Sequence, residues 1–180
     1  MSGLTKPPYN FCAASYERLP PHKSSFNGIC HGSRNGFEQN FISKIEDFKA
    51  VGTDISPTAK DYERSVEWDF HKANPDWIGK FDFVYTNSLD QSWNPRLALV
   101  TWLNQLNQDG VLVIEHTEAH GPSGASEMDP FGVRPHMMPY VLIDWFGAEV
   151  SLNIVESKKS NHEGMPVWLF FMRKSVENIS

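Results

Sequence analysis

The segment GICHGSRNGFEQ, residues 28–39, constrains the fold of this chain more than any other segment. A short apolar run enters a glycine turn there, and an amphipathic helix follows. About eighteen residues after Gly36, a second apolar run, AVGTDIS, brings in Asp54. This order and spacing are typical of a βαβ unit that binds a nucleotide-like cofactor. We expect the Asp54 carboxylate to accept hydrogen bonds from a ribose.

Length, charge and cysteine content narrow the class of protein. A chain of 180 residues that is 40% hydrophobic fits one globular domain. Its net charge of −6 argues against a broad basic face for nucleic acid. Cys12 and Cys30 form no disulfide framework, and the histidine spacings match no metal motif, so we expect no metal. The sequence shows neither a secretion signal nor an apolar run approaching ~18 residues, which predicts a cytoplasmic protein without a membrane span.

Apolar periodicity predicts an alternation of strands and helices. Strands are expected at 27–31, 50–54, 65–69, 81–86, 111–115, 149–155 and 167–173, and helices at 35–49, 94–107 and 135–146. The first helix is assigned from an apolar stripe at Phe37, Phe41, Ile45 and Phe48. Residues 1–26, which contain four prolines, are expected to form an arm packed on a single domain, residues 27–180.

The order of these elements predicts an α/β fold with a doubly wound, mostly parallel sheet and a C-terminal antiparallel hairpin. The run 81–86 is nearly all apolar, as in a central strand buried on both faces. Gln108-Asp109-Gly110 is expected to break the chain before the fifth strand, and loop 156–165 is too short for a crossover helix. A sheet finished in this way resembles the class I, Rossmann-like S-adenosylmethionine-dependent methyltransferases. The NAD-binding fold differs, because its two halves repeat in parallel.

The resemblance covers residues 27–174 and is carried by five motifs in order. The first motif of the family is an acidic residue followed by a GxGxG turn; here Gly32 and Gly36 match the outer glycines, Cys30 stands at the acidic position and Arg34 at the middle glycine. The later segments are AVGTDIS, VEWDFHK, FDFVYTNSLDQSWNP and QDGVLVIEH. The resemblance implies S-adenosylmethionine as cofactor, bound by Cys30, Gly32, Ser33, Asn35, Gly36, Asp54, Ile55, Asp69, Phe70, Asn87 and Ser88.

Within that set the resemblance implies separate roles. Asp54 would hold both ribose hydroxyls and Ile55 would pack on adenine, while Asp69 would bind the adenine amino group and Phe70 would cover the ring. Each aspartate has a plainer alternative, because Asp54 could cap a following helix and Asp69 could cap the next turn. Arg34 suits a phosphate ligand, or is a solvated residue of the first helical turn.

Charge supports the same cofactor independently of the resemblance. Asp54, Asp69 and Asp90 are expected at the carboxyl ends of parallel strands, where their field suits a sulfonium cation better than a pyrophosphate. Methyl transfer is mainly a matter of positioning, and a hydroxyl or amine acceptor would also need a base. His116 is the first candidate for that catalytic role and Asp90 the second.

A long loop follows the fifth predicted strand. Residues 117–135 are rich in Gly, Pro and Ser, and we expect them to form a mobile flap that grips the acceptor through Glu118, His120 and Phe131. The predicted function is methyl transfer from S-adenosylmethionine to a small-molecule acceptor, by a chain that could also form a homo-oligomer.

Other classes of function are weighed against this one. The main alternative is a protein of the same fold that binds S-adenosylmethionine or S-adenosylhomocysteine without methyltransferase activity, because Cys30 and Arg34 are atypical. An NAD-dependent oxidoreductase would need GxGxxG and a second nucleotide-binding half, and the sequence has neither. A scaffold role without a cofactor would leave the positions of Asp54 and Asp69 in this pattern without a functional reason.

Overall fold

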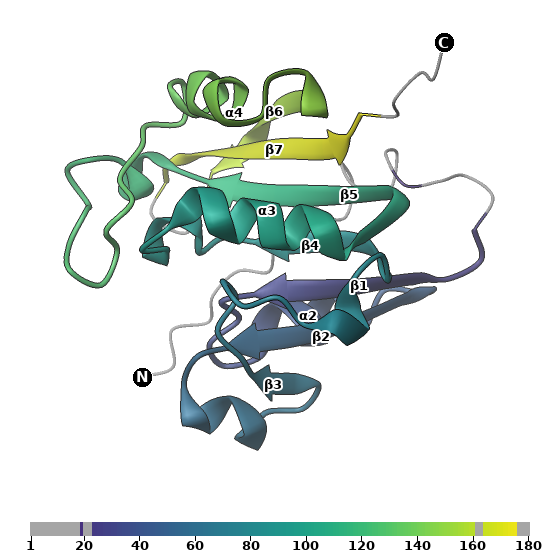
Figure 1. The fold of residues 1–180 in the computed structure, drawn as a ribbon. Coiled ribbons are helices and arrows are strands. Elements are labelled where there is room, and N and C mark those ends of the chain that lie inside the picture. Colours follow the sequence, from purple (N-terminus) through teal and green to yellow (C-terminus); the bar gives the residue numbers. More distant parts are fainter. Residues whose placement is uncertain (1–18, 20–22, 161–163, 176–180) are drawn as a thin grey trace, which may run out of the picture.

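A seven-stranded sheet forms the centre of the computed structural model, which describes residues 19, 23–160 and 164–175 (Figure 1). The strands are β1 (Phe26–His31), β2 (Phe48–Asp54), β3 (Ser65–Glu67), β4 (Phe81–Thr86), β5 (Leu106–His116), β6 (Val150–Ser160) and β7 (Pro166–Lys174). Their order is β3-β2-β1-β4-β5-β7-β6. β1 to β5 pair in parallel, whereas β7 is antiparallel to both β5 and β6. The predicted α/β fold with its terminal antiparallel hairpin is confirmed.

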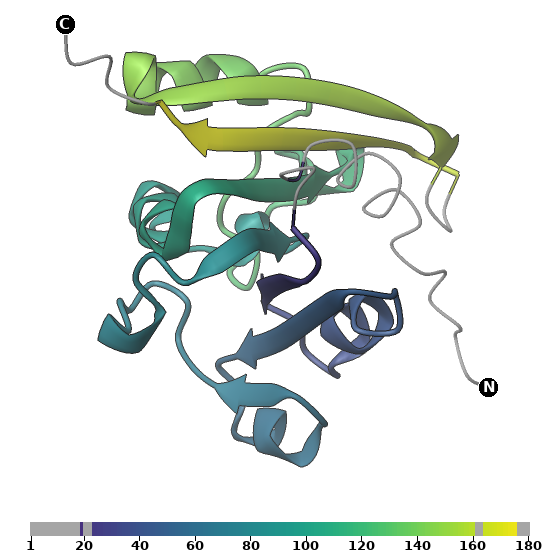
Figure 2. The same cartoon turned by 90° about the vertical axis from the view of Figure 1, so that its right-hand side faces the viewer.

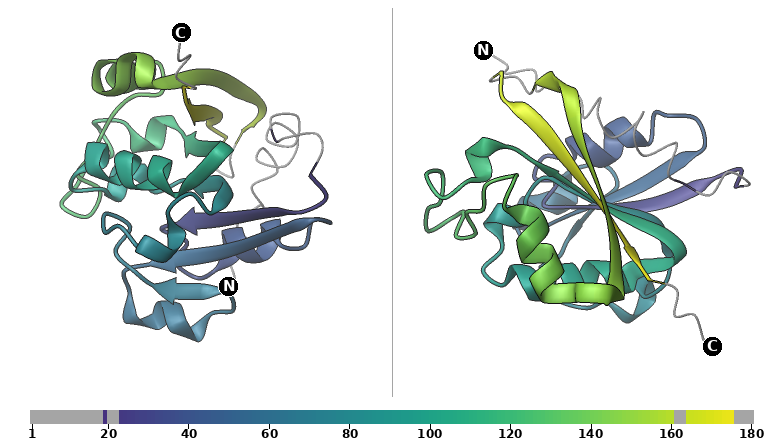
Figure 3. Two further views of the ribbon diagram at one scale, coloured as in Figure 1. Left: turned by 45° about the vertical axis from the view of Figure 1, so that its right-hand side comes forward. Right: turned by 90° about the horizontal axis from the view of Figure 1, so that it is seen from above.

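Helices cover both faces of the twisted sheet (Figures 2 and 3). α2 (Phe37–Ile42) packs on one face, and α3 (Pro95–Gln105) and α4 (Met138–Phe146) lie on the other. The start of α3 is fixed locally, because the Asn94 side chain accepts a hydrogen bond from the backbone N–H of Leu97 and Pro95 occupies the first turn. Short 3₁₀ turns connect the rest: η1 (Pro57–Asp61), η2 (Pro75–Trp77), η3 (Leu89–Gln91), η4 (Glu118–His120) and η5 (Gly147–Glu149). No helix among the described residues is long and apolar enough to cross a membrane.

The two faces of the sheet bury separate apolar layers. On the α3 and α4 side, Ile29, Val84 and Leu112 pack with Trp102 and Leu142. The opposite layer contains Cys30, Phe83, Tyr85 and Val113, together with Leu19 and Ile42. All six residues of β4 are buried, as expected for the central strand.

The predicted helix over 35–49 is wrong beyond its first turns. α2 ends at Ile42, a turn with Asp47 at φ 70° reverses the chain, and β2 already begins at Phe48. The Phe48 ring lies 5.0 Å from the Phe26 ring and 5.7 Å from the Phe83 ring. Phe48 is therefore buried from a strand, although its spacing continues the helical stripe.

The predicted break at residues 108–110 lies within β5 as an irregularity of the strand. Leu106 pairs with Phe81 and Val111 with Phe83, so residues 107–110 bulge out of the regular ladder, and the Asp109 N–H donates to the Asn107 side chain at 3.2 Å. A Cβ at Gly110 would lie 2.9 Å from the carbonyl oxygen of Phe81, so Gly110 also allows a close approach of the two strands. Smaller differences are that β3 ends at Glu67, α4 starts at Met138 and β6 extends to Ser160. Of the predicted arm, residues 1–18 and 20–22 lie outside the described residues.

Candidate functional site

The carboxyl ends of the five parallel strands meet at one edge of the sheet, on the side where loop 117–135 lies in Figure 1. β1 and β4 are neighbours at the centre, and the chain turns outward from them in opposite directions. Such a switch point is where open α/β sheets bind ligands. The predicted glycine turn leaves β1 at this point.

The glycine turn is held against β4 by close contacts. Gly32 has φ 69° and its carbonyl accepts a hydrogen bond from the Ser88 hydroxyl at 3.2 Å. A Cβ at Gly32 would lie only 2.5 Å from the Cβ of Ser88. On the other side, the Ser33 N–H donates to the Thr53 carbonyl at 2.9 Å. The turn therefore fits between β2 and the residues that follow β4, and only glycine fits at position 32.

Arg34 adopts a left-handed backbone at φ 43°, between the positive φ of Gly32 and that of Gly36 (76°). This conformation costs an ordinary residue about 1 kcal/mol or more relative to glycine. The resemblance places a glycine at this position, and the geometry explains that preference. The Arg34 side chain is exposed, as is Asn35.

Asp54 ends β2 directly beside this turn. Its Oδ2 accepts a hydrogen bond from the Arg34 N–H at 2.9 Å, and its Oδ1 accepts one from the Ser56 N–H at 2.9 Å. Each carboxylate oxygen keeps a second lone pair, so the oriented carboxylate can still accept from a ligand hydroxyl. The neighbouring Ile55 is 71% exposed and offers an apolar surface next to that carboxylate.

Asp69 lies in a hydrogen-bonded row with His71 and Ser92. The Asp69 Oδ1 accepts from the His71 N–H at 3.0 Å and lies 2.8 Å from the His71 Nδ1, while the His71 Nε2 is 2.7 Å from the Ser92 hydroxyl. Burial alone would raise the pKa of Asp69, but the hydrogen bonds from His71 outweigh it and lower that pKa. The Trp93 ring packs on His71 at 4.4 Å and is 65% exposed, so an aromatic surface borders this carboxylate.

Phe70 is half-buried in an aromatic cluster. Its ring packs edge-on against Trp102 at 5.3 Å, and its carbonyl accepts from the Trp102 indole N–H at 3.2 Å. The His31 ring stacks on the other side of this cluster, 5.2 Å from Trp102. The adenine roles of Asp69 and Phe70 stay predictions.

A group of carboxylates and neutral polar groups on the α2 side of the same strand ends was not found from the sequence. The Asn87 amide donates to Glu38 Oε1 at 3.4 Å, and the Tyr85 hydroxyl donates to Glu115 Oε2 at 3.0 Å. The second oxygen of Glu38, Oε2, is buried and finds no hydrogen-bond partner in the part of the chain that the structure describes. The only sequence signal for Glu38 is an acidic residue in the first turn of the helix after the glycines.

Burial determines the protonation states of the side chains in this cluster. Burial, assisted by the carboxylates of Glu115 and Asp54, raises the pKa of Glu38 to about 7 against the lowering effect of its hydrogen bonds with its own backbone and with Asn87. The pKa of Glu115 is also raised by burial, against the lowering effect of the Tyr85 hydrogen bond. Cys30, predicted at the acidic position of the turn, is a buried thiol whose pKa is raised by burial and by Glu38. At neutral pH Cys30 is therefore uncharged and cannot supply the missing carboxylate.

The two predicted catalytic residues lie at the ends of one short row. Asp90 Oδ2 is 3.9 Å from His120 Nε2, and His120 Nδ1 is 3.3 Å from His116 Nδ1. The His116 Nε2 must donate, because it lies 2.6 Å from the Val133 carbonyl. Burial lowers the pKa of His116 to about 4, the Val133 hydrogen bond opposes this, and the charge of His120 adds to it. His116 is thus neutral at pH 7, with both ring nitrogens facing protein groups.

Asp90 is the more available of the two. Its Oδ1 is buried, and no described residue forms a hydrogen bond with it. Burial raises the pKa of Asp90 despite the opposing effect of the His120 charge. A carboxylate with these properties can accept a proton near neutral pH more readily than an ordinary one.

Loop 117–135 is tied to the strand ends by backbone hydrogen bonds. The Phe131 N–H donates to the Asp90 carbonyl at 2.9 Å, and the Val133 N–H donates to the His120 carbonyl at 3.0 Å. The Phe131 ring packs against Trp145 at 5.7 Å, and Glu118 is exposed. The contacts place this loop beside both predicted catalytic residues, and its role as a mobile flap stays a prediction.

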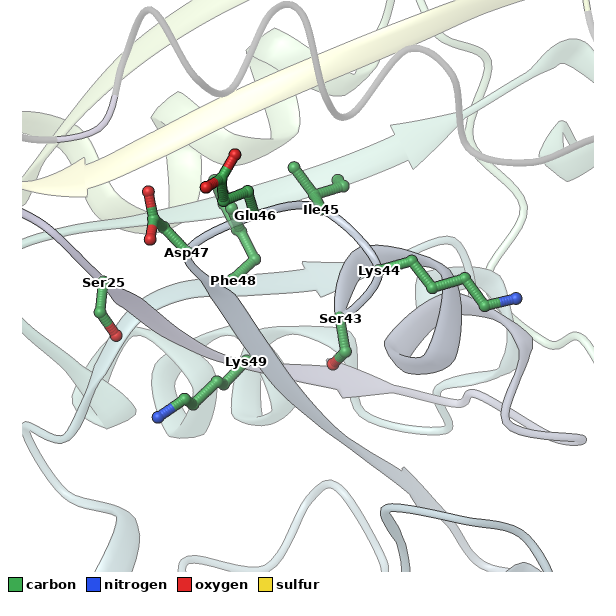
Figure 4. Close-up of a pocket in the computed structure, with 8 residues that line it drawn as sticks. All are labelled: Ser25, Ser43, Lys44, Ile45, Glu46, Asp47, Phe48 and Lys49. Atoms are coloured by element: carbon green, nitrogen blue, oxygen red, sulfur yellow. The ribbon is translucent and has the colours of Figure 1, made fainter.

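A pocket of about 490 Å³ lies at the other edge of the sheet (Figure 4). It is lined by Ser25, which precedes β1, and by residues 43–49, which lead into β2. These are the amino ends of the parallel strands, so this pocket is separate from the predicted cofactor site. Among residues 19, 23–160 and 164–175, no three His, Cys, Asp or Glu side chains are grouped to hold a metal ion.

No family model matches the sequence, and no curated protein matches it. Solved structures do match. A TehB-like S-adenosylmethionine-dependent methyltransferase from Corynebacterium glutamicum is 20% identical, with 85% of this chain and 82% of that chain covered and a TM-score of 0.60. The [4+2]-cyclase SpnF is 13% identical, with 91% and 80% covered and a TM-score of 0.68.

The CMeT domain of the citrinin polyketide synthase is 12% identical over 89% of this chain, with a TM-score of 0.62. This chain spans about half the length of that domain, 49%. Sequence identities this low support a conclusion about the fold but not about the activity. Strand order, the antiparallel β7 and these similarities agree, and the chain has the class I S-adenosylmethionine-dependent methyltransferase fold.

Proposed function

We propose that this chain binds S-adenosylmethionine at the carboxyl ends of β1, β2 and β4 and transfers its methyl group to a small-molecule acceptor. The observation that carries this proposal is the glycine turn at the switch point, with the Asp54 carboxylate fixed beside it by the Arg34 N–H at 2.9 Å. A cofactor that carries a ribose and a positive charge suits the carboxylates gathered at these strand ends.

The residues present fit this cofactor. The close contact at Gly32 leaves bare backbone facing the ligand, Asp54 offers acceptors for ribose hydroxyls, and Ile55 gives an apolar surface for a base. Glu38 Oε2 has no donor among the described residues, and a ligand can supply one. When bound, S-adenosylmethionine supplies a methyl group activated by its sulfonium. The protein binds, aligns the acceptor and excludes water.

Asp90 is the proposed base for a hydroxyl or amine acceptor. Its unpartnered Oδ1 can take the acceptor's proton, and His120 lies 3.9 Å from its other oxygen. His116 donates from Nε2 to the Val133 carbonyl, so its basic nitrogen is Nδ1, which faces His120 Nδ1 at 3.3 Å. His116 can therefore take that role only where His120 moves aside, which ties His116 to the position of loop 117–135. Both roles need the acceptor to lie between Asp90 and this loop.

A second candidate function is binding of S-adenosylmethionine or S-adenosylhomocysteine without methyl transfer. Two observations favour it: Cys30 is neutral where the resemblance expects an acid, and the fold neighbour SpnF is a cyclase. The two candidates are told apart by whether S-adenosylhomocysteine accumulates when acceptors are supplied with S-adenosylmethionine.

Replacing Asp54 by Asn is expected to weaken S-adenosylhomocysteine binding by about tenfold to a hundredfold. The substitution removes the charge from hydrogen bonds to the ribose, which are worth roughly 1.5–3 kcal/mol. Asp61→Asn, an exposed carboxylate at the end of η1, is the matched control and should bind like wild type. Calorimetric titration measures both. Equal affinity for wild type and Asp54→Asn would leave Asp54 as a cap of its own turn.

A further inference from the structure

We propose that Glu38 is the anionic partner of the ammonium group in the methionine part of the cofactor, in the place of the carboxylate that this chain lacks at Cys30. The inference rests on the proposed function, because it assigns a residue of α2 to one part of that cofactor. It also predicts that the cofactor binds together with the release of a proton.

The position of Glu38 brings its carboxylate to the switch point. Gly36 ends the glycine turn and α2 begins at the next residue, so Glu38 lies in the first helical turn, directly after the bare backbone of the site. Its Oε1 accepts from the Asn87 amide, which follows β4, at 3.4 Å. Glu38 also acts electrostatically on Cys30, which precedes the turn on β1. The carboxylate therefore lies between the two central strand ends, on the side where an acidic residue is expected.

Hydrogen bonding distinguishes Glu38 from the other carboxylates of this group. Asp54 already accepts from two backbone N–H groups, and Glu115 accepts from the Tyr85 hydroxyl. Glu38 Oε2 is buried and has no hydrogen-bond partner among residues 19, 23–160 and 164–175. A buried carboxylate oxygen without a donor is costly, and native proteins rarely keep one without a reason. A ligand that brings an N–H⁺ donor would satisfy it.

The charges that face Glu38 select a cation. The groups around it are Asp54 from β2, Glu115 from β5, Tyr85 from β4, Asn87 directly after β4, and Cys30 from β1. The two charged groups in this set are both acidic. An ammonium group is attracted by this environment, whereas the pyrophosphate of a dinucleotide would be repelled.

Ionisation of Glu38 couples binding to pH. Burial holds the pKa of Glu38 at about 7 in the ligand-free protein, so at pH 6 about nine in ten molecules carry the neutral acid. Pairing with the ligand's ammonium favours the carboxylate and lowers that pKa. The acid proton passes to the buffer, the ammonium keeps its protons, and a charge-assisted hydrogen bond forms. About one proton is released for each ligand bound at pH 6.

The test is calorimetric titration at pH 6.0 in buffers that differ in ionisation enthalpy, with S-adenosylhomocysteine and 5′-methylthioadenosine as ligands. At this pH the ligand's α-amino group, with an ordinary pKa near 7.7–8.0, is already protonated when free. S-adenosylhomocysteine carries that group, and 5′-methylthioadenosine lacks the amino acid part. Neither ligand carries a sulfonium, so the comparison isolates the ammonium.

For wild type we expect release of about one proton with S-adenosylhomocysteine and none with 5′-methylthioadenosine. Glu38→Gln should weaken S-adenosylhomocysteine binding by about tenfold to a hundredfold and abolish the proton release. Its affinity for 5′-methylthioadenosine should stay within about twofold of wild type. Glu46→Gln, an exposed acid in the turn after α2, is the matched control and should behave as wild type.

Two results overturn the inference while the proposed function stands. One is that Glu38→Gln binds S-adenosylhomocysteine as wild type does; the other is that it loses the same factor for both ligands, which indicates a structural role. If wild type binds neither ligand, the proposed function fails and the inference fails with it. Folding of Glu38→Gln is checked by its melting temperature at pH 8. We expect that temperature to be no lower than that of wild type, because the substitution removes a buried acid that ionises at a cost.

Discussion

Acidification from pH 7 to pH 4.5 is expected to remove about 2 kcal/mol of folding stability through His31, and a similar amount through His116. Burial lowers the pKa of His31 from 6.5 to about 4, against the hydrogen bond to Gln105, and the pKa of His116 is also lowered to about 4. Each unit of pKa difference corresponds to about 1.4 kcal/mol.

The sign follows from which state binds protons more tightly. The folded-state pKa of each histidine is depressed below the unfolded value, so below pH 6.5 the unfolded chain takes up protons that the folded chain resists. Stability is fully present above pH 6.5 and is lost as the pH falls toward 4. Burial is the cause for His31, whose ring is enclosed in the protein with Nδ1 2.8 Å from the Thr53 hydroxyl and Nε2 2.8 Å from Gln105 Oε1, so protonation would place a charge out of reach of water.

Buried acids act in the opposite direction, so variants are needed to isolate the histidines. The pKa of Glu38 is raised to about 7, and it therefore costs stability above its unfolded value of 4.5 and recovers that stability as the pH falls. His31→Gln and His116→Gln should each reduce, by about 2 kcal/mol, the decrease in the free energy of unfolding between pH 7 and pH 4.5. Urea denaturation at the two pH values measures this decrease. His136→Gln, at an exposed position, is the control and should keep the wild-type slope. A wild-type slope in His31→Gln would show that His31 is protonated in the folded protein.

Gly32→Ala is expected to weaken S-adenosylhomocysteine binding by at least about tenfold and to destabilise the protein by several kcal/mol. The positive φ of 69° costs an alanine roughly 1–2 kcal/mol. The new Cβ would also lie 2.5 Å from the Cβ of Ser88, so the residues after β4 must move away from the turn. That movement costs a further ~1–3 kcal/mol and opens the backbone cradle.

Gly79→Ala is a closely matched control for this effect. Gly79 has nearly the same φ, 67°, but nothing lies within 4 Å of its Cβ position. The control therefore carries the backbone strain alone, and we expect it to lose roughly 1–2 kcal/mol of stability with no change in affinity. Denaturation of both variants measures stability, and titration measures affinity. Their comparison separates the effect of backbone strain from that of the contact with Ser88. Equal affinities for Gly32→Ala and wild type would mean that the glycine turn does not border the cofactor.

The sequence predicted the sheet better than it predicted the helices. A strand buried on both faces is continuously apolar, and β4 is buried along its whole length as residues 81–86 indicated. The helical stripe was misleading because Phe48 points into the same apolar layer from β2 as a helix residue would. Periodicity records burial and cannot show where the chain reverses at Asp47.

In the candidate site, too, some residues could be predicted from the sequence and others could not. Asp54 could be predicted, because its place at the end of an apolar run after a glycine turn is a local pattern. Glu38 could not, because a glutamate in the first turn of a helix is usually a solvated end residue. Whether its carboxylate faces inward depends on how α2 docks against the strands, and this follows from contacts such as that with Asn87, 49 residues further along the chain.

Binding of S-adenosylmethionine at the glycine turn is tested most directly by calorimetric titration of the wild-type protein with S-adenosylmethionine, S-adenosylhomocysteine and NAD. We expect both sulfur ligands to bind at one site per chain and to raise the melting temperature, by a stabilisation of about 2.7 kcal/mol at ~100 times Kd. NAD should not bind, because its pyrophosphate would meet Glu38, Asp54 and Glu115. Binding of NAD without binding of either sulfur ligand would contradict the proposed cofactor.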